Sequence, residues 1–201
     1  MNLSSTPLRG WRARAGRLLA AAAVSLCAVL PGAQLAATVD PASSPELTVH
    51  ETHGTYSVTA RFDVPHSPEI ALDVLSDYEG IPRFMPDVRT STVLERGPGR
   101  VLVAQEAVSQ FMLFSRKVHL VLEVIEEGNS IRFTDRSRKS FHHYRGSWHA
   151  VGTANGAAIT YELAAKPAFD VPEFILKRLL RRDSGEMISR LRLEMAARAA
   201  R

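Results

Sequence analysis

The segment "FHHYRGSWH", residues 141–149, holds the side chains best suited to acid–base chemistry. If this segment is a strand, alternate residues point to opposite sides, which places His142 and Tyr144 together on one face. Imidazole exchanges protons near neutral pH, so an inward-facing His142 beside Tyr144 could support general acid–base catalysis. No second residue at a fixed motif spacing completes a catalytic set. We therefore favour the alternative that the outer residues are solvated and the inner ones only packed.

The sequence contains no residue pattern typical of a metal-binding or phosphate-binding site. His142 and the adjacent His143 would point to opposite faces of a strand, so they cannot bind one ion together. The chain has neither a phosphate-cradling glycine loop nor a nucleophile elbow. We predict no bound metal and no cofactor.

Two other stretches suggest contact with a lipid or membrane. Phe111 to Phe114 are four consecutive apolar residues next to Arg116 and Lys117. The run is either a buried strand or a loop whose apolar tip, flanked by positive charge, suits a membrane surface. Lys177 to Arg182, "KRLLRR", is a basic band on a predicted helix. Such a band is either a solvated face or a docking site for anionic lipid or a partner.

The first 37 residues have the pattern of a secretory signal peptide. Arginines precede the apolar run from Leu18 to Leu30, and small residues follow it. The run is too short to span a bilayer. We predict cleavage near Ala37 and a periplasmic or secreted protein. The alternative is a membrane anchor left uncleaved, because Leu35 stands where a small residue is preferred.

Removal of this segment changes the charge balance. The whole chain has 25 basic and 21 acidic residues, and the segment takes away four arginines and no acid. The mature chain is then formally neutral, which argues against a nucleic-acid partner. The single cysteine, Cys27, lies in the apolar run, so the exported domain has no disulfide.

The rest of the chain predicts an α+β domain. Residues 38–55 are interpreted as a polar linker, and residues 56–201 as one domain. Tyr56 to Val64 alternates as a half-buried strand, and a short helix follows it. From Val88 the chain is strand-like, and Pro172 to Ala200 is a long amphipathic helix. Because strands and helices do not alternate, the sheet is expected to be antiparallel.

These features together resemble a known family. The strand at 56–64, the bend "SDYEGIPRFMPDV" at 76–88, the "RGSWHAV" strand at 145–151 and the closing helix resemble the START-like polyketide cyclase/dehydrase (SRPBCC) family, and within it the coenzyme Q-binding START-like branch. The resemblance implies a helix-grip fold. In that fold a curved antiparallel sheet of about seven strands surrounds a long C-terminal helix, with two short helices after strand one. Pro82 and Pro86 would bend the chain before strand two.

The resemblance also implies a function. A curved sheet around a helix leaves an apolar cavity, so we expect a hydrophobic small molecule or lipid as ligand, with an isoprenoid quinone as one candidate. Two alternatives stay open: a cyclase or dehydratase that uses His142 and Tyr144, and an envelope interaction module with a filled core. The residues expected to contact ligand or core are Phe84, Met85, Phe111, Leu120, Leu122, Tyr144, Trp148, Leu176, Leu180 and Met187.

Overall fold

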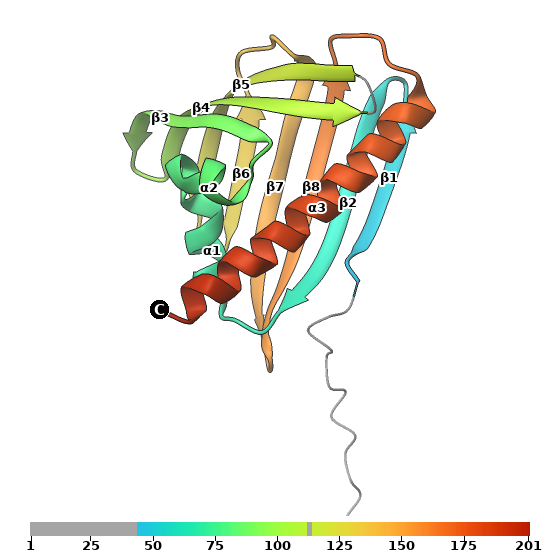
Figure 1. Ribbon diagram of the computed structural model, residues 1–201. Helices are drawn as coiled ribbons and strands as arrows, with labels where there is room; N and C mark the ends of the chain where they lie inside the picture. The colour runs from blue at the N-terminus through green and yellow to red at the C-terminus, as the bar shows by residue number, and fades with distance from the viewer. Residues whose placement is uncertain (1–43, 112–113) are drawn as a thin grey trace, which may run out of the picture. The chain divides into compact units, whose positions relative to one another are not determined.

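The computed structural model describes residues 44–201, with a gap at 112–113 and without the side chains of 109–116. One sheet of eight antiparallel strands has the order β1-β2-β8-β7-β6-β5-β4-β3. The long helix α3 crosses one face of this curved sheet (Figure 1). The bounds are β1 Glu46–Thr52, β2 Thr55–Val64, α1 Pro68–Ser76, η1 Tyr78–Gly80, α2 Ile81–Phe84, β3 Val88–Gly97, β4 Arg100–Phe111, β5 Phe114–Glu127, β6 Ser130–Asp135, β7 Phe141–Thr153, β8 Gly156–Pro167 and α3 Glu173–Ala199.

Alternation along the strands builds the core on the helix-facing side of the sheet. In β2, alternate residues from Tyr56 to Val64 are buried, and in β8 alternate residues from Ala157 to Ala165 are buried. The two strands pair so that Val58 lies opposite Leu163, which joins their apolar rows into one surface. The α+β class and the antiparallel sheet predicted from the sequence are confirmed.

The sheet begins earlier in the chain than predicted. Glu46–Thr52 forms β1, which pairs with β2 and lies under α3. Leu47 and Val49 are the only two residues of β1 that pack on or within the core. The prediction of a polar linker is therefore wrong for these seven residues, and the sheet has eight strands instead of about seven. The proposed cleavage position near Ala37 lies outside the described residues.

The bend between α1 and β3 is built differently from the prediction. α1 ends at Ser76, η1 follows it, and Pro82 lies in the first turn of α2 instead of ending a helix. Proline suits that position because the first helical N–H groups have no intrahelical partner. Only Pro86, after the α2 cap at Met85, stands where the chain leaves the helix for β3.

Tyr78 fixes this bend to the sheet. Its ring is buried, and its hydroxyl donates a 2.6 Å hydrogen bond to Glu126 at the end of β5. Burial, followed by the hydrogen bond and charge of Glu126, raises the pKa of Tyr78 well above its ordinary value. The phenol is therefore protonated and serves as a structural donor.

The long helix is packed unevenly along its length. Its backbone lies closest to β1 and β2 and to α1 and α2. In its second half Ile188, Leu191 and Met195 are fully or almost fully buried. In its first half only Leu176 and Ser184 are buried, and Phe174 is 74% exposed. The C-terminal half of α3, whose end lies beside α1 (Figure 1), holds three of the five buried residues of the helix.

Candidate functional site

The residues predicted to line a cavity divide into two groups. Leu120, Leu122, Trp148 and Leu176 are buried. The partly buried group packs against the core while keeping some accessible surface. Its members are Phe84, Met85, Tyr144, Leu180 and Met187. The side chain of Phe111 lies outside the described residues.

Two aromatic clusters occupy the inner face of β6, β7 and β8. Trp148 stacks on Tyr161 with ring centroids 4.2 Å apart. Tyr144 lies 4.9 Å from the ring of Phe141 and 5.9 Å from the ring of Phe133. Tilted and offset arrangements of this kind are favourable for aromatic rings. They give the inner face of the sheet a polarisable apolar surface.

Two tyrosines of this inner face, Tyr144 and Tyr161, have pKa values raised by burial. Burial, with a smaller contribution from the negative charge of Asp135, raises the pKa of Tyr144 to about 12. The phenol therefore stays protonated at neutral pH. In that state it is a hydrogen-bond donor and a weak acid, and it cannot act as a general base.

His142 does not join Tyr144 on the inner face. The pairing of β7 with β8 shifts register between Phe141 and His143, so His142 is the extra residue of a β-bulge. The bulge brings the ring of Phe141 beside that of Tyr144 and leaves His142 exposed. The predicted strict alternation, and with it the inward-facing His142, is wrong at this point.

Space on the inner face is closed at Gly146. A Cβ atom there would lie 2.5 Å from Cζ of Phe133 and closer still to the carbonyl oxygen of Glu162. The Phe133 ring therefore covers the position that a side chain would occupy. This part of the interior is packed, and accessible apolar surface is found instead around Tyr144, Leu180 and Met187.

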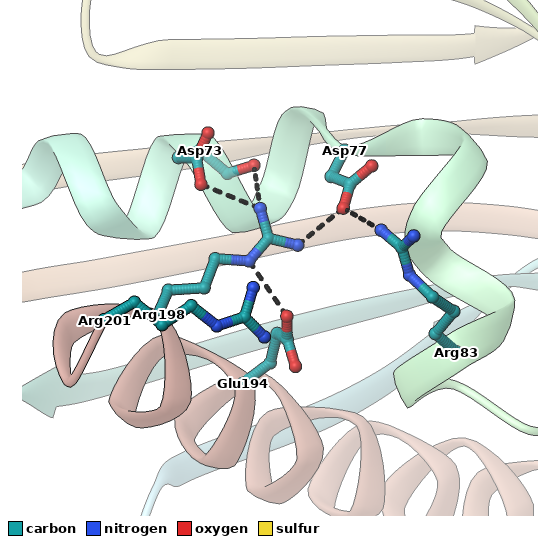
Figure 2. A pocket seen from close by; sticks show the side chains of 6 residues that line it. All are labelled: Asp73, Asp77, Arg83, Glu194, Arg198 and Arg201. Atoms are coloured by element: carbon teal, nitrogen blue, oxygen red, sulfur yellow. Dashed lines mark hydrogen bonds and ion pairs between the residues drawn. The ribbon is translucent and has the colours of Figure 1, made fainter.

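A polar surface pocket lies where the end of α3 meets α1 (Figure 2). It encloses about 470 Å³. Arg198 lies at its centre and donates to Asp73 (2.7 Å), Asp77 (2.6 Å) and Glu194 (2.9 Å). These contacts tie the last turns of the helix to α1 and η1. The lining residues are Asp73, Asp77, Arg83, Glu194, Arg198 and Arg201.

Opposing effects set the ionisation of this cluster. Partial burial alone would raise the pKa of Asp77, but the hydrogen bond and charge of Arg198, assisted by Arg83, lower it overall. Burial alone would lower the pKa of Arg198, but its bonds to the three carboxylates raise it. Both partners are charged over the physiological pH range, so the cluster acts as a permanent ionic clamp.

A second pocket of about 260 Å³ opens beside the first residues of β7. His142, His143 and Tyr144 line one side of it, and Asp135 and Arg138 are among the residues on the other. Neither of the two pockets coincides with the predicted apolar cavity, although Tyr144 belongs to both the second pocket and the inner face.

Part of the predicted basic band is engaged in ion pairs on its own helix. Lys177 contacts Glu173 at 2.5 Å, and Arg182 contacts Asp183 at 2.8 Å. The other predicted membrane contact, Phe111 to Phe114, includes residues outside the described ones. Within residues 44–111 and 114–201, no helix combines the length and apolarity needed to cross a membrane. The same residues contain no group of three or more histidine and carboxylate side chains placed to hold a metal.

Sequence reasoning missed two polar features of the site. The Arg198 cluster joins residues of α1 and α3 that lie far apart in the chain, so no local spacing reveals it. Asp135, which is 6% exposed, ends β6 as the acid of "FTDRS". An aspartate followed by serine at a strand end is a turn signal, and that signal could have identified a buried acceptor of backbone N–H groups.

Solved structures with the same architecture include proteins of three kinds. The Zhui aromatase/cyclase from Streptomyces sp. R1128 is 14% identical, covers 72% of this chain and 96% of its own, and has a TM-score of 0.62. A START superfamily protein from Mycobacterium smegmatis is 16% identical over 70% and 97% of the two chains, with a TM-score of 0.61. A STAR-related lipid transfer protein from Xanthomonas axonopodis is 16% identical over 77% and 99%, with a TM-score of 0.59.

These likenesses define the fold as the helix-grip fold of START-like proteins, as predicted. The chain belongs to the family described as polyketide cyclase/dehydrase and lipid transport, whose model matches residues 64–192, more than half of the chain. No curated protein matches it. Membership covers both lipid-binding and cyclase proteins, so the choice between them depends on the residues of this chain.

Proposed function

We propose that this protein binds a hydrophobic small molecule or lipid between the inner face of the sheet and the first half of α3. The observation that carries the proposal is the partly exposed apolar surface around Tyr144, Leu180 and Met187. Apolar side chains in the interior of a closed core are normally buried completely. Here Tyr144 on the sheet and Leu180 and Met187 on the long helix pack against the core and still keep accessible surface.

The ionic clamp at Arg198 makes this arrangement suitable for ligand uptake. It fixes the C-terminal end of α3 on α1, while the first half of the helix has few buried residues. A helix held at one end can move at the other without loss of the fold, because regions with few buried apolar contacts open at lower free energy than the core. A ligand can reach a binding site under such a helix when the free end of the helix opens locally.

Binding is favoured over catalysis by the two residues considered for acid–base chemistry. His142 is exposed on a bulge, and Tyr144 has a pKa raised to about 12. A protonated tyrosine can orient a carbonyl or hydroxyl group of a ligand. A cyclase or dehydratase also needs a base beside the apolar chain of its substrate, and His142 instead lines the polar pocket at the start of β7.

We further propose export and a membrane-associated ligand. The basic, then apolar N-terminal segment supports secretion to the periplasm or beyond. Phe174, 74% exposed in the first turn of α3, precedes the basic band at Lys177 to Arg182. An exposed aromatic residue beside cations suits the surface of an anionic membrane, from which a lipid or an isoprenoid quinone would be taken.

The test begins with the protein purified from its native compartment. We expect mass spectrometry to detect a co-purifying lipid or quinone, and a fluorescent fatty-acid probe to compete with it. Leu180→Trp fills the space next to the inner face and should lower probe binding at least tenfold. Leu193→Trp is the matched control, because Leu193 is on the same helix but 72% exposed.

The outcomes separate the alternatives. Loss of probe binding in Leu180→Trp but not in Leu193→Trp, with both variants folded, supports the proposal. A wild-type protein that carries no lipid and binds no probe contradicts it and indicates a filled-core interaction module. For the enzyme alternative, Tyr144→Phe would lower turnover of a polyketide substrate by about 100-fold or more. In a binding protein the same change alters the affinity for an uncharged probe such as oleyl alcohol only a few-fold.

A further inference from the structure

The pocket beside β7 lies where two strands separate. β6 and β7 pair as far as Thr134 and Arg145, and the chain between them forms a loop over residues 136–140. The pocket of about 260 Å³ occupies this gap. A water molecule takes roughly 30 Å³ in the liquid, so the gap has room for a small polar headgroup and some water. The lining residues are Thr134, Asp135, Arg136, Arg138, His142, His143 and Tyr144.

The one buried acid of this pocket is already satisfied by the protein. One oxygen of Asp135 accepts hydrogen bonds from the backbone N–H groups of Val121 and Ser137, both at 2.9 Å. Its other oxygen accepts from the Ser137 hydroxyl and the Arg138 N–H, both at 3.1 Å. The carboxylate thus serves to shape the loop. Its lone pairs already accept hydrogen bonds from the protein, so the carboxylate needs no bound cation to satisfy it.

The arginine and histidine side chains of the pocket differ in how far the protein satisfies them. Arg136 is bound to Glu123 on the neighbouring strand. The side chains of Arg138, His142 and His143 take part in no hydrogen bond or ion pair with the described part of the chain. Arg138 has a positive φ of 52°, a conformation that costs free energy in a residue other than glycine and that Asp135 holds in place.

We infer that this pocket binds the anionic headgroup, a carboxylate or a phosphate, of an amphiphile whose apolar chain lies on the inner face. The inference rests on the proposed function and specifies its ligand class. Arg138 presents a planar fork of donors that matches either oxyanion. His142 and His143 also line the pocket, and their ring N–H groups are further donors for such an anion.

Tyr144 connects the headgroup pocket to the apolar surface. Tyr144 is one of the residues that line the pocket, and its ring packs against the rings of Phe133 and Phe141 on the inner face of the sheet. Because its phenol stays protonated, it donates a hydrogen bond to an oxyanion and does not repel it. A ligand with a charged end and an apolar chain would therefore cross Tyr144 at the boundary between its two parts.

The test measures binding of five compounds to the purified protein by calorimetry. Oleate and dodecyl phosphate carry a chain and an anionic head, oleyl alcohol carries a chain alone, and acetate and inorganic phosphate serve together as the chain-free anions. We expect oleate or dodecyl phosphate to bind at least tenfold more tightly than oleyl alcohol, and the chain-free anions to bind at least 100-fold more weakly. A charged hydrogen bond contributes about 1.5–3 kcal/mol, which corresponds to about 10- to 100-fold in affinity.

Variants locate the headgroup. Arg138→Gln combined with His143→Gln should lower affinity for oleate and dodecyl phosphate about tenfold or more and leave oleyl alcohol within twofold. Arg145→Gln is the control, because Arg145 is exposed on the same strand and does not line the pocket. Thermal unfolding of each variant checks that the fold is kept, and the comparison of oleate with oleyl alcohol on the wild type needs no variant.

The results distinguish this inference from the proposed function. If oleate, dodecyl phosphate and oleyl alcohol bind equally well, the anion site is refuted while the apolar site stands. If no chain-bearing probe binds, the proposed function itself fails. Tight binding of inorganic phosphate with no gain from a chain also overturns the inference, because the site would then serve a free anion. Equal loss in the Arg145→Gln control would assign the effect to general surface charge.

Discussion

The ionic clamp at the end of α3 can be removed by the single change Arg198→Met. The arginine side chain is 14% exposed, and its partners Asp77 and Glu194 are 26% and 20% exposed. Methionine keeps the apolar length of the side chain but leaves these two carboxylates without their cation. The third partner, Asp73, is 68% exposed and is screened by water.

The expected magnitude follows from these exposures. Breaking a fully buried ion pair costs about 3–5 kcal/mol, and breaking an exposed one costs about 0–1 kcal/mol. Two partly buried pairs and one exposed pair place the loss of unfolding free energy at about 2–3 kcal/mol. For a domain of this size each kcal/mol lowers Tm by about 2–4 °C, so Tm should fall by about 4–12 °C.

The assay is urea unfolding followed by Trp148 fluorescence or circular dichroism. Arg132→Met is the matched control, because the Arg132–Glu127 pair at 2.9 Å is 57% and 61% exposed. We expect the control to change the unfolding free energy by less than about 1 kcal/mol. If Arg198→Met costs no more than this control, the clamp is not what fixes the end of the helix.

The clamp also has a pH signature. The pKa of Asp77 is lowered in the folded protein, so its stabilising effect is complete above the ordinary pKa of an aspartate. The effect is lost as pH falls from that value through the lower folded pKa. Stability of the wild type should therefore fall on the acid side of about pH 4. The Arg198→Met variant should show a shallower fall over the same interval, because the shift of Asp77 depends chiefly on Arg198.

Three further outcomes are expected. Tyr78→Phe removes the buried hydroxyl that bonds Glu126 and should cost about 1–2 kcal/mol in urea unfolding; no loss would mean that the bond is exchanged for water without effect. Gly146→Ala places a Cβ against Phe133 and Glu162 and should cost at least about 1–3 kcal/mol; a neutral result would show that the sheet yields there. In an alkaline absorbance titration, Tyr144→Phe should remove an ionisation step near pH 12, and an unchanged curve would show that this phenol does not titrate there.

Most of the fold could be predicted from the sequence, because apolar residues repeat at a different spacing in strands and in helices. Alternation identifies β2, and the apolar stripe of the terminal segment predicts α3 almost to its ends. β1 was missed because only Leu47 and Val49 point to the core in a segment that is otherwise polar. Such a strand is stabilised by its pairing with β2 and by the helix above it, and neither is visible locally.

The site was predicted less well, because it depends on register and on distant pairs. The bulge at His142 changes which residues face inward. The extra residue of a bulge cannot be recognised from the residue types of a single strand. The Arg198 cluster joins three elements, and the pocket at Arg138 exists because β6 and β7 separate. Most of the apolar residues predicted to contact ligand or core do pack on or within the core, since burial follows the same alternation that identifies the strands. Their contact with a ligand stays a prediction.

The central pairing of β2 with β8 has a consequence for how the chain is assembled during synthesis. Strands β3 to β8 pair with their neighbours in sequence, so each can join the sheet as it leaves the ribosome. β2 emerges before all of them, yet its inner partner is the last strand. Until β8 appears, the β1–β2 hairpin keeps an unpaired edge, which is a site for wrong pairing with other chains. β2 and β8 are separated by almost the whole length of the domain. We therefore expect the pairing of these two strands to be the slow step of folding.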